Sequence, residues 1–240
     1  MHLSVIIPAY NEEKRLPKTL ASINDYLLKQ SYDYEILVVD NGSKDRTSEV
    51  VKNLESQIKG LKLISGSAGV GKGFAVKKGT LEAKGDLRVF TDADNSTPLQ
   101  ELEKMWPYFQ QGYDIVIGSR NVKGAILDPP QPFLRKYVLG TGFKLLRKII
   151  LGLWDIEDTQ CGFKVFNKRS AEAIFPKVKT LDFAFDAEVL AIARRQDFKV
   201  KEAPVYWKND IDSKVKFKSI VKMAIDLVII KINLIKGIYD

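Results

Sequence analysis

Short apolar segments alternate with amphipathic ones along the first half of the chain, and this alternation limits the folds that the sequence can adopt. The apolar segments are typical of buried strands and lie at residues 3–7, 35–39, 61–64, 87–90 and 114–117. Helical patterns lie between them, most clearly at residues 11–28 and 72–83. Strands and helices alternating at this spacing predict an α/β domain built on a doubly wound parallel sheet.

The composition supports a globular domain and excludes several kinds of site. With 240 residues, 45% hydrophobic and 28% charged, the chain can bury a substantial core. Its 38 Lys and Arg against 30 Asp and Glu give a net charge of +8, which suits an anionic partner such as a phosphorylated molecule, an anionic lipid or nucleic acid. A single cysteine, Cys161, and a single histidine, His2, exclude an internal disulfide, a zinc cluster and a Ser-His-Asp triad. Any metal must therefore be bound by oxygen.

Polar residues follow several of the predicted strands directly. The turn at residues 8–12 follows the first strand, Asp40 ends the second, Asp92 and Asp94 follow the fourth, and Arg120 follows the fifth. Ligands of such sheets bind beyond the carboxyl ends of the strands. We therefore expect these residues to meet in one crevice.

The acidic residues each allow two interpretations. Asp92 and Asp94 can hold a hard cation that bridges a diphosphate, or they can cap the helix that follows. Asp40 can accept a hydrogen bond from a base or a ribose, or it can close a turn.

Residues 66–73 nearly spell a phosphate-binding P-loop, but Gly73 stands where that motif requires a hydroxyl. A P-loop NTPase is therefore a distant alternative, and a protein that binds nucleotide without turnover is another. Lys72, at a glycine-rich helix start, could still contact a phosphate.

The second half of the chain has a different organisation. Residues 134–154 form a basic and apolar segment, and residues 158–207 predict the order strand, helix, loop, helix, strand. The tail at residues 217–238 is aliphatic but interrupted by charges, and its longest apolar stretch is far below the ~20 residues of a membrane span. We expect amphipathic helices that lie on a membrane surface or complete the core. We also expect no signal peptide and a cytoplasmic setting.

The motifs taken together resemble the GT-A glycosyltransferases of family 2. Those at residues 5–12, 38–45, 71–73, 92–94 and 118–120 occur in that family's order. Asp-Thr-Gln-Cys-Gly-Phe-Lys at residues 158–164 and Phe-Asp-Ala-Glu at residues 185–188 are similar to the dolichyl-phosphate glucosyltransferase branch of the polyprenyl-phosphate sugar synthases. The resemblance implies a GT-A domain at residues 1–210, with an interfacial helix at about 134–154, and an amphipathic tail at residues 211–240.

The resemblance also assigns a donor site and a metal site. Mg²⁺ or Mn²⁺ would be held by Asp92, Asp94 and Ser96, where Ser96 stands in place of a glutamine common in relatives that use mannose, and water is the alternative third ligand. Asp94 and Asp158 are the expected catalytic residues. The residues expected to bind the nucleotide-sugar are Pro8, Ala9, Tyr10, Asn11, Glu12, Asp40, Lys72, Asp92, Ala93 and Asp94.

The expected reaction is an inverting transfer of a hexose from a nucleotide-sugar, with UDP-glucose as donor and polyprenyl or dolichyl phosphate as acceptor. A lipid phosphate is already mostly dianionic at neutral pH, so it needs cations such as Arg120 and Arg135 rather than a base. Asp158 would orient the acceptor site, or act as a base if the acceptor is a sugar hydroxyl. GDP-mannose as donor and a hydroxyl as acceptor are the alternatives. We expect a protein on the cytoplasmic face of a membrane that binds no nucleic acid.

Overall fold

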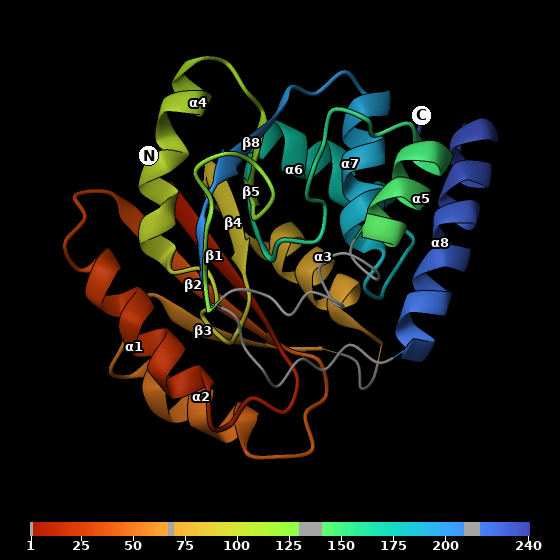
Figure 1. Ribbon diagram of the computed structural model, residues 1–240. Coiled ribbons are helices and arrows are strands. Elements are labelled where there is room, and N and C mark those ends of the chain that lie inside the picture. The colour runs from red at the N-terminus through yellow and green to blue at the C-terminus, as the bar shows by residue number, and fades with distance from the viewer. Residues whose placement is uncertain (1, 67–69, 130–140, 209–216) are drawn as a thin grey trace.

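The computed structural model describes residues 2–66, 70–129, 141–208 and 217–240. Its centre is a seven-stranded sheet with the strand order β3-β2-β1-β4-β7-β5-β8 (Figure 1). The strands are β1 (His2–Ala9), β2 (Asp33–Asp40), β3 (Leu61–Ser65), β4 (Leu87–Thr91), β5 (Ile115–Ser119), β7 (Phe163–Asn167) and β8 (Val200–Pro204). The predicted α/β fold with a mostly parallel sheet is confirmed.

Strand β7 departs from the parallel arrangement. It lies between β4 and β5 and runs antiparallel to both, whereas β1, β2, β3 and β4 pair in parallel and β5 pairs in parallel with β8. Since β7 begins at the edge where β4 and β5 end, the residues that precede it join the carboxyl ends of the parallel strands. The chain's turn at residues 158–162 is thereby brought to the crevice predicted from the first half of the sequence.

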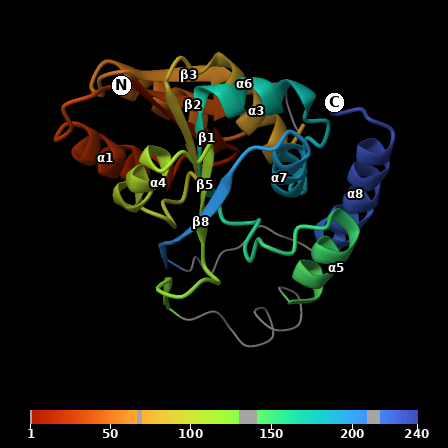
Figure 2. The same cartoon turned by 90° about the horizontal axis from the view of Figure 1, so that it is seen from above.

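The alternation of side chains along the strands divides the core into two layers. Val5 and Ile7 face a layer formed by α1 (Leu16–Leu27), α2 (Thr47–Glu55) and η1 (Leu99–Lys104). Ile6 faces the other layer, which contains α3 (Lys72–Glu82), α6 (Lys168–Ile174) and α7 (Phe185–Arg195). Figure 2 shows these helices on the two sides of the sheet. A short α4 (Trp106–Gln110) follows η1, and η3 (Phe175–Lys177) follows α6.

Two further helices extend the second layer. Helices α5 (Thr141–Leu151) and α8 (Phe217–Ile235) lie side by side next to α7 (Figures 1 and 2). The buried residues Met223, Leu227 and Ile230 join α8 to the same core as α7. A separate two-stranded ladder pairs β6 (Ile126–Asp128) with β9 (Tyr206–Lys208). No helix in the described ranges is long and apolar enough to cross a membrane.

The first helix begins later than the sequence predicts. We expected it to start at Asn11, but α1 starts at Leu16 with Pro17 in its first turn. Asn11 has a φ of 54°, in the left-handed region, so residues 10–15 form a turn instead. The predicted order of elements in residues 158–207 is confirmed by β7, α6, α7 and β8.

Gly79 tests the packing of α3 on the sheet. A Cβ at this position would lie 2.5 Å from Cγ2 of Ile6 and 2.8 Å from Cγ2 of Val39. We expect Gly79→Ala to lower the free energy of unfolding by about 1–3 kcal/mol, because the well-packed core must shift. Urea denaturation measures the change.

Gly142, in α5, is the matched control. None of the described residues lies within 4 Å of a Cβ built there, so Gly142→Ala should stabilise the protein through helix propensity alone, by at most roughly 0.5–1 kcal/mol. Equal effects of the two substitutions would contradict this account of the α3 packing.

Candidate functional site

The turns that follow β1 and β2 are tied together by hydrogen bonds. The amide N–H of Asn11 donates to Oγ of Ser43 at 2.9 Å, and the Asn11 side chain accepts from the amide of Lys44 at 2.8 Å. Glu12 donates its amide N–H to Oγ1 of Thr47 at 2.8 Å, while its carboxylate pairs with Arg15 at 2.7 Å. The predicted donor-binding turn is therefore a fixed structure at the carboxyl edge of the sheet.

The other residues predicted in this turn lie at the end of β1. Pro8 and Ala9 are its last two residues, with Ala9 buried, and Tyr10 is exposed. The carbonyl of Ala9 accepts a hydrogen bond from the amide of Asn41 at 2.9 Å, which joins the ends of β1 and β2.

Asp40 lies buried at the end of β2, and its carboxylate closes the turn that follows. Its Oδ1 accepts the amide of Ser43 at 2.9 Å, and its Oδ2 accepts the hydroxyl of Ser48. The turn interpretation of Asp40 is therefore present in the structure. Each carboxylate oxygen can accept a second hydrogen bond, so a contact from Asp40 to a nucleoside stays a prediction.

Asp92 and Asp94 follow β4 as predicted, and a lysine joins them. The Nζ of Lys72 lies 2.6 Å from Oδ1 of Asp92. Oδ1 of Asp94 accepts the amide of Ser96 at 2.9 Å. The buried Ala93 between the two acids is held through its carbonyl, which accepts the hydroxyl of Thr19 at 2.7 Å.

The electrostatics of this cluster are compatible with a bound cation. Burial and the neighbouring charge of Asp92 raise the pKa of Asp94 above its ordinary value. Burial alone would lower the pKa of Lys72, but Asp92 and Asp186 outweigh burial and raise it. Lys72 therefore stays charged at neutral pH, and an added cation would favour the charged form of Asp94.

The donor set fits a hard divalent cation. Two carboxylates one residue apart offer the oxygen ligands that Mg²⁺ and Mn²⁺ prefer, and a cation between them would relieve the repulsion that raises the pKa of Asp94. In the part of the chain that the structure describes, no third acid, cysteine or histidine joins them. The hydroxyl of Ser96 bonds to Asp94, so its role as a ligand stays a prediction. The remaining ligands would come from a diphosphate and water.

Arg120 and Asp158 form a second charged pair at the same edge. The guanidinium donates to Asp158 from Nε at 2.7 Å and from Nη2 at 2.9 Å, and the amide of Arg120 donates to the same carboxylate at 3.0 Å. The guanidinium lies 5.2 Å from the centre of the Trp207 ring. Burial alone would raise the pKa of Asp158, but Arg120 lowers it to about 2.

In this geometry the Asp158 carboxylate orients the Arg120 guanidinium. A carboxylate with so low a pKa, which accepts three hydrogen bonds from Arg120 and one from the amide of Gln160, is a poor proton acceptor at neutral pH. It holds the Arg120 fork in one position instead, and Arg120 also lies near the charge of Asp92. The other predicted acceptor-phosphate residue, Arg135, and its neighbour Lys136 lie outside the described residues.

Three residues of the site were not assigned from the sequence. Gly162 packs its backbone against the carboxylate of Asp92, with no room for a side chain. Lys164 in β7 is fully buried and pairs with Asp186 of α7 at 2.5 Å. A signal was present, because a lysine inside an apolar strand and an aspartate at the start of an apolar helix both require a partner.

Comparison with known proteins assigns the family. Residues 4–175 match the family described as Glycosyl transferase family 2. The chain belongs to this family. The family expected from the sequence motifs is thereby confirmed, and the chain is a glycosyltransferase.

Relatives match nearly the whole chain, and solved structures share its fold. The dolichyl-phosphate beta-glucosyltransferase of Trichomonas vaginalis is 38% identical over 239 residues, which cover 95% of this chain and 72% of the relative. The human dolichyl-phosphate beta-glucosyltransferase is 34% identical over 258 residues, covering 98% and 76%. The fold is shared with Mycobacterium tuberculosis glucosyl-3-phosphoglycerate synthase, solved with Mn²⁺, UDP and its product, with a TM-score of 0.67, 18% identity and coverage of 97% and 78%.

In this glycosyltransferase, Gly71 and Gly73 at the start of α3 pack against other protein segments. A Cβ at Gly73 would lie 2.7 Å from Cβ of Phe185, and Gly71, with a φ of 126°, packs on the carbonyl of Leu181. The two glycines therefore let α3 begin close to residues 181–185, which points Lys72 toward Asp92. Together with the family assignment, this arrangement sets the NTPase alternative aside.

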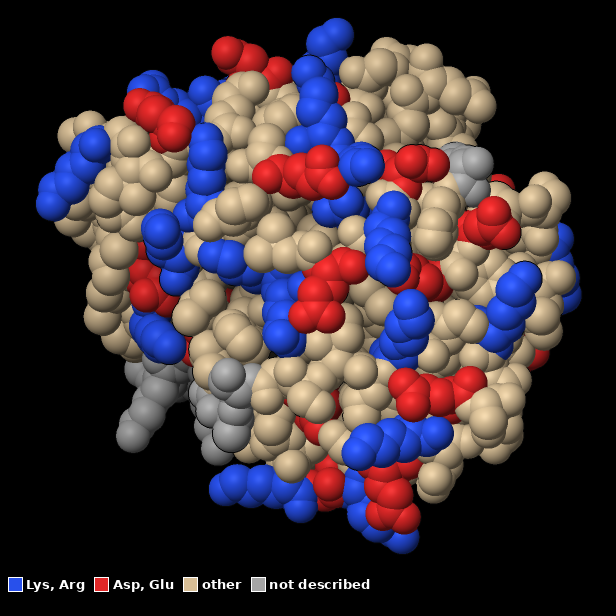
Figure 3. Space-filling view, turned by 180° about the vertical axis from the view of Figure 1, so that it is seen from behind, with Lys and Arg blue, Asp and Glu red and all other residues tan. Residues whose placement is uncertain are grey.

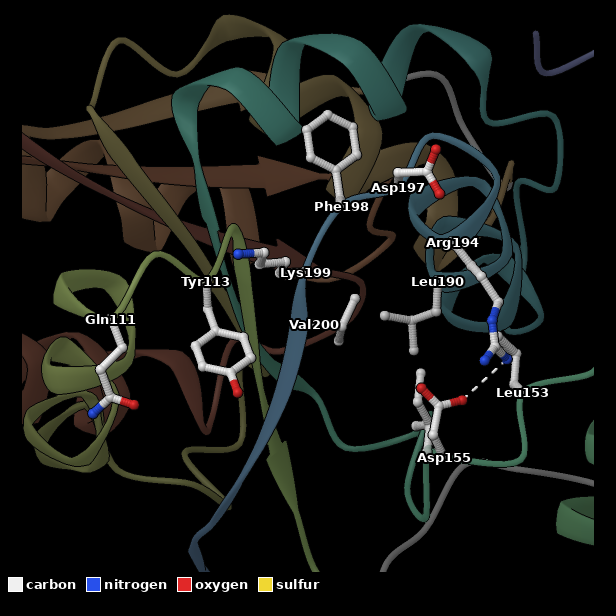
Figure 4. Close-up of a pocket in the computed structure, with 11 residues that line it drawn as sticks. Gln111, Tyr113, Leu153, Asp155, Leu190, Arg194, Asp197, Phe198, Lys199 and Val200 are labelled. Carbon is white, nitrogen blue, oxygen red and sulfur yellow. Dashed lines mark ion pairs between the residues drawn. The ribbon is translucent and has the colours of Figure 1, made fainter.

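A cavity of about 550 Å³ lies elsewhere on the glycosyltransferase. Figure 4 shows it between the end of α7 and the starts of β5 and β8, where Arg194 and Asp155 pair at 3.0 Å. The starts of these strands lie at the opposite edge of the sheet from Asp92. None of the predicted site residues lines this cavity, so the cavity is separate from the candidate site.

The Arg120–Asp158 pair generates a stability prediction. Arg120→Met leaves the Asp158 carboxylate buried without a cation, and we expect the free energy of unfolding at pH 7 to fall by about 3–5 kcal/mol. Without Arg120, burial should raise the pKa of Asp158 above its ordinary value. The Arg120→Met variant should then regain stability as the pH falls through that raised pKa. The wild type should lose stability only as the pH falls from about 4 toward the pKa of Asp158 near 2.

The difference in the free energy of unfolding between the wild type and Arg120→Met should therefore decrease as the pH falls from 7 to 4. Denaturant titrations at several pH values would measure it. Arg169→Met is the matched control, because Arg169 pairs with Asp114 but its side chain is 72% exposed. Arg169→Met should lower the free energy of unfolding by no more than about 1 kcal/mol. A deficit in Arg120→Met that is independent of pH would contradict the role of Asp158.

Proposed function

We propose that this family 2 enzyme transfers glucose, with inversion, from UDP-glucose to dolichyl or polyprenyl phosphate. The observation that carries the proposal is the Arg120 guanidinium, held by Asp158 at the same sheet edge as Asp92 and Asp94. The cluster thus offers an acidic cation site for one phosphate group and a fixed arginine for another. Relatives that match nearly the full chain are dolichyl-phosphate beta-glucosyltransferases.

The donor would bind along the carboxyl ends of β1, β2 and β4. Asp40 and the turn at residues 8–12 would contact the nucleoside, and Lys72 would contact the diphosphate. Asp92 and Asp94 would hold Mg²⁺ or Mn²⁺, which neutralises charge on the departing UDP. The mycobacterial neighbour was also solved with Mn²⁺ and UDP-glucose, which supports the same donor and ion here.

The acceptor phosphate would lie against Arg120. An oxygen of the phosphate forms the new bond to the anomeric carbon as the bond from that carbon to the UDP oxygen breaks, and the attack from the opposite face inverts the configuration. Since a phosphate monoester is mostly dianionic at neutral pH, no proton has to be removed. The planar guanidinium can bind two phosphate oxygens while Asp158 fixes its orientation.

Other donors and acceptors have less support. A sugar hydroxyl requires a base, and Asp158, with a pKa near 2, is poorly suited to that task. Mannose is disfavoured by Ser96, which stands in place of a glutamine common in relatives that use mannose, and by the glucosyl names of the relatives. Nucleic acid would need a continuous basic surface, whereas on the face in Figure 3 Lys and Arg alternate with Asp and Glu.

A transfer assay tests the reaction. Protein, Mn²⁺ and radiolabelled UDP-glucose are incubated with polyprenyl phosphate, and label is expected in the organic phase. GDP-mannose should give far less product. Asp94→Asn should reduce the rate at least about 100-fold, the scale of losing one electrostatic contact to a developing charge, because it removes one of the two carboxylates of the cation site.

Asp114→Asn serves as the control variant, because Asp114 is a buried acid that directly precedes β5, at the opposite edge of the sheet from Asp94. It should keep its activity per folded molecule. Transfer of label to a soluble sugar instead of the organic phase would overturn the proposed acceptor.

We also propose that α5 and α8 rest this enzyme on the cytoplasmic face of a membrane. The inner side of α8 is buried, but its outer side exposes Ile225, Ile229 and Ile232 at helical spacing, to 57%, 47% and 44%. In α5, Ile149 is 61% exposed. The exposed Lys231 lies beside the α8 stripe, where it suits anionic lipid headgroups. A lipid-linked acceptor would emerge at such a surface.

Vesicle binding tests this surface without any acceptor. The wild type should sediment with vesicles that contain anionic lipid and less with neutral vesicles. A variant with Ile225→Ser and Ile229→Ser should sediment markedly less, because it loses apolar area from the outer side of α8. Leu28→Ser, at an equally exposed site after α1 (62%), is the control and should bind as the wild type does. Equal binding by all three proteins would contradict the membrane proposal.

A further inference from the structure

Glu188 is a fully buried carboxylate for which the proposed reaction has no use. It lies in α7, two residues after Asp186 and on a different side of the helix. In the described part of the structure it forms no ion pair and instead collects hydrogen bonds. Its oxygens accept the amides of Lys179 and Thr180 at 3.0 and 2.7 Å, and Oε1 accepts the hydroxyl of Tyr239 at 2.5 Å.

Tyr239 reaches this carboxylate from the segment that follows α8. Its ring is fully buried, and its hydroxyl also accepts the side-chain amide of Asn233 at 3.1 Å. Burial and the bond to Glu188 raise the pKa of Tyr239 well above its ordinary value, so the hydroxyl remains a donor. Its carbonyl accepts Lys177 and Gln196, both at 3.0 Å. Tyr239, in the segment after α8, is thus fixed in the core beside α7.

The two amides held by Glu188 belong to a segment that supports the start of α3. Immediately after Lys179 and Thr180, the carbonyl of Leu181 accepts the amide of Phe74 at 3.0 Å. A Cβ at Gly73 would lie 2.8 Å from the carbonyl oxygen of Thr180 and 3.0 Å from that of Asp182. Residues 179–182 therefore form the wall on which the start of α3 packs.

Two lysines connect the same wall to its neighbours. Lys77 of α3 donates to the carbonyl of Val178, the residue directly before the wall, at 2.8 Å. Lys222 of α8 pairs with Asp182 at 2.7 Å. Contacts from α3, α7 and α8 thus hold the wall in place. The wall contacts Gly71 and Gly73, and Lys72 lies between these two glycines.

We propose that Glu188 and Tyr239 are positioning residues for the donor site, which fix residues 179–182 and through them place the Lys72 ammonium beside Asp92. Neither residue touches the predicted donor, and both act through backbone contacts. The inference rests on the proposed function only in giving Lys72 a contact to the donor diphosphate. It explains why a carboxylate with no ion-pair partner among the described residues is kept inside the core, where burial would otherwise be destabilising.

The test combines UDP affinity with a double-mutant cycle. Tyr239→Phe removes one hydrogen bond to a charged group, and we expect UDP in the presence of Mg²⁺ to bind about five- to tenfold more weakly in isothermal titration. In a Lys72→Met background the same substitution should leave UDP affinity unchanged, because the effect passes through Lys72. A purely structural role would weaken binding equally in both backgrounds and would overturn the proposal.

Asp240→Asn is the matched control. Asp240 anchors the neighbouring residue by pairing with Arg195 at 2.6 Å, but it does not contact Glu188. This variant should bind UDP as the wild type does. If it weakens binding as much as Tyr239→Phe, general anchoring of the tail accounts for the effect and the proposal fails.

Hydrogen exchange gives a readout that is independent of nucleotide. In Tyr239→Phe the amides of Phe74, Lys179 and Thr180 should exchange faster, while those of β1 should not change. Unchanged exchange at Phe74 would overturn the proposal even if UDP affinity fell. A wild type that binds UDP but transfers no glucose to a lipid phosphate would refute the proposed function and leave this inference standing.

Discussion

The site depends on the antiparallel insertion of β7 between β4 and β5. A parallel strand at this place would begin at the far edge of the sheet, and the turn before it would lie there too. Because β7 begins where its neighbours end, Gly162 reaches the carboxylate of Asp92 and Asp158 reaches Arg120. The acidic cluster and the acceptor-side arginine thus share one edge.

The charges at this edge are arranged as pairs, since a lone charge inside a protein is strongly destabilising. Lys72 pairs with Asp92, Arg120 with Asp158, and Lys164 with Asp186. The pKa of Asp94 is raised by burial and by the charge of Asp92, so an added cation would stabilise the charged form of this acid. An arrangement of this kind suits a ligand that brings both a metal ion and phosphate groups.

Local sequence patterns predict the strands of the sheet and the polar residues at its carboxyl edge. The period of apolar residues identifies the strands, and the polar residues that end them identify Asp40, Asp92, Asp94 and Arg120 as neighbours. The start of α1 was placed wrongly, because the left-handed conformation of Asn11 is set by its bonds to Ser43 and Lys44 in the next turn. No local pattern carries that information.

The direction of β7 and the roles of the residues around it are also long-range properties. Lys164 and Asp186 lie 22 positions apart in the sequence and meet only because α7 packs on β7. Tyr239 and Glu188 are 51 positions apart and meet only because α8 returns along α7. The sequence marks such residues as polar members of apolar segments, but their partners follow from the assembled fold.

The central claim is that a phosphate acceptor held by Arg120 needs no proton acceptor from the enzyme. The solvent deuterium isotope effect on the rate of transfer from UDP-glucose to polyprenyl phosphate tests it most directly. We predict an effect close to unity when the chemical step limits the rate, because no proton moves in that step. A large normal effect that disappears in Asp158→Asn would show that Asp158 takes a proton from the acceptor, and would contradict the account.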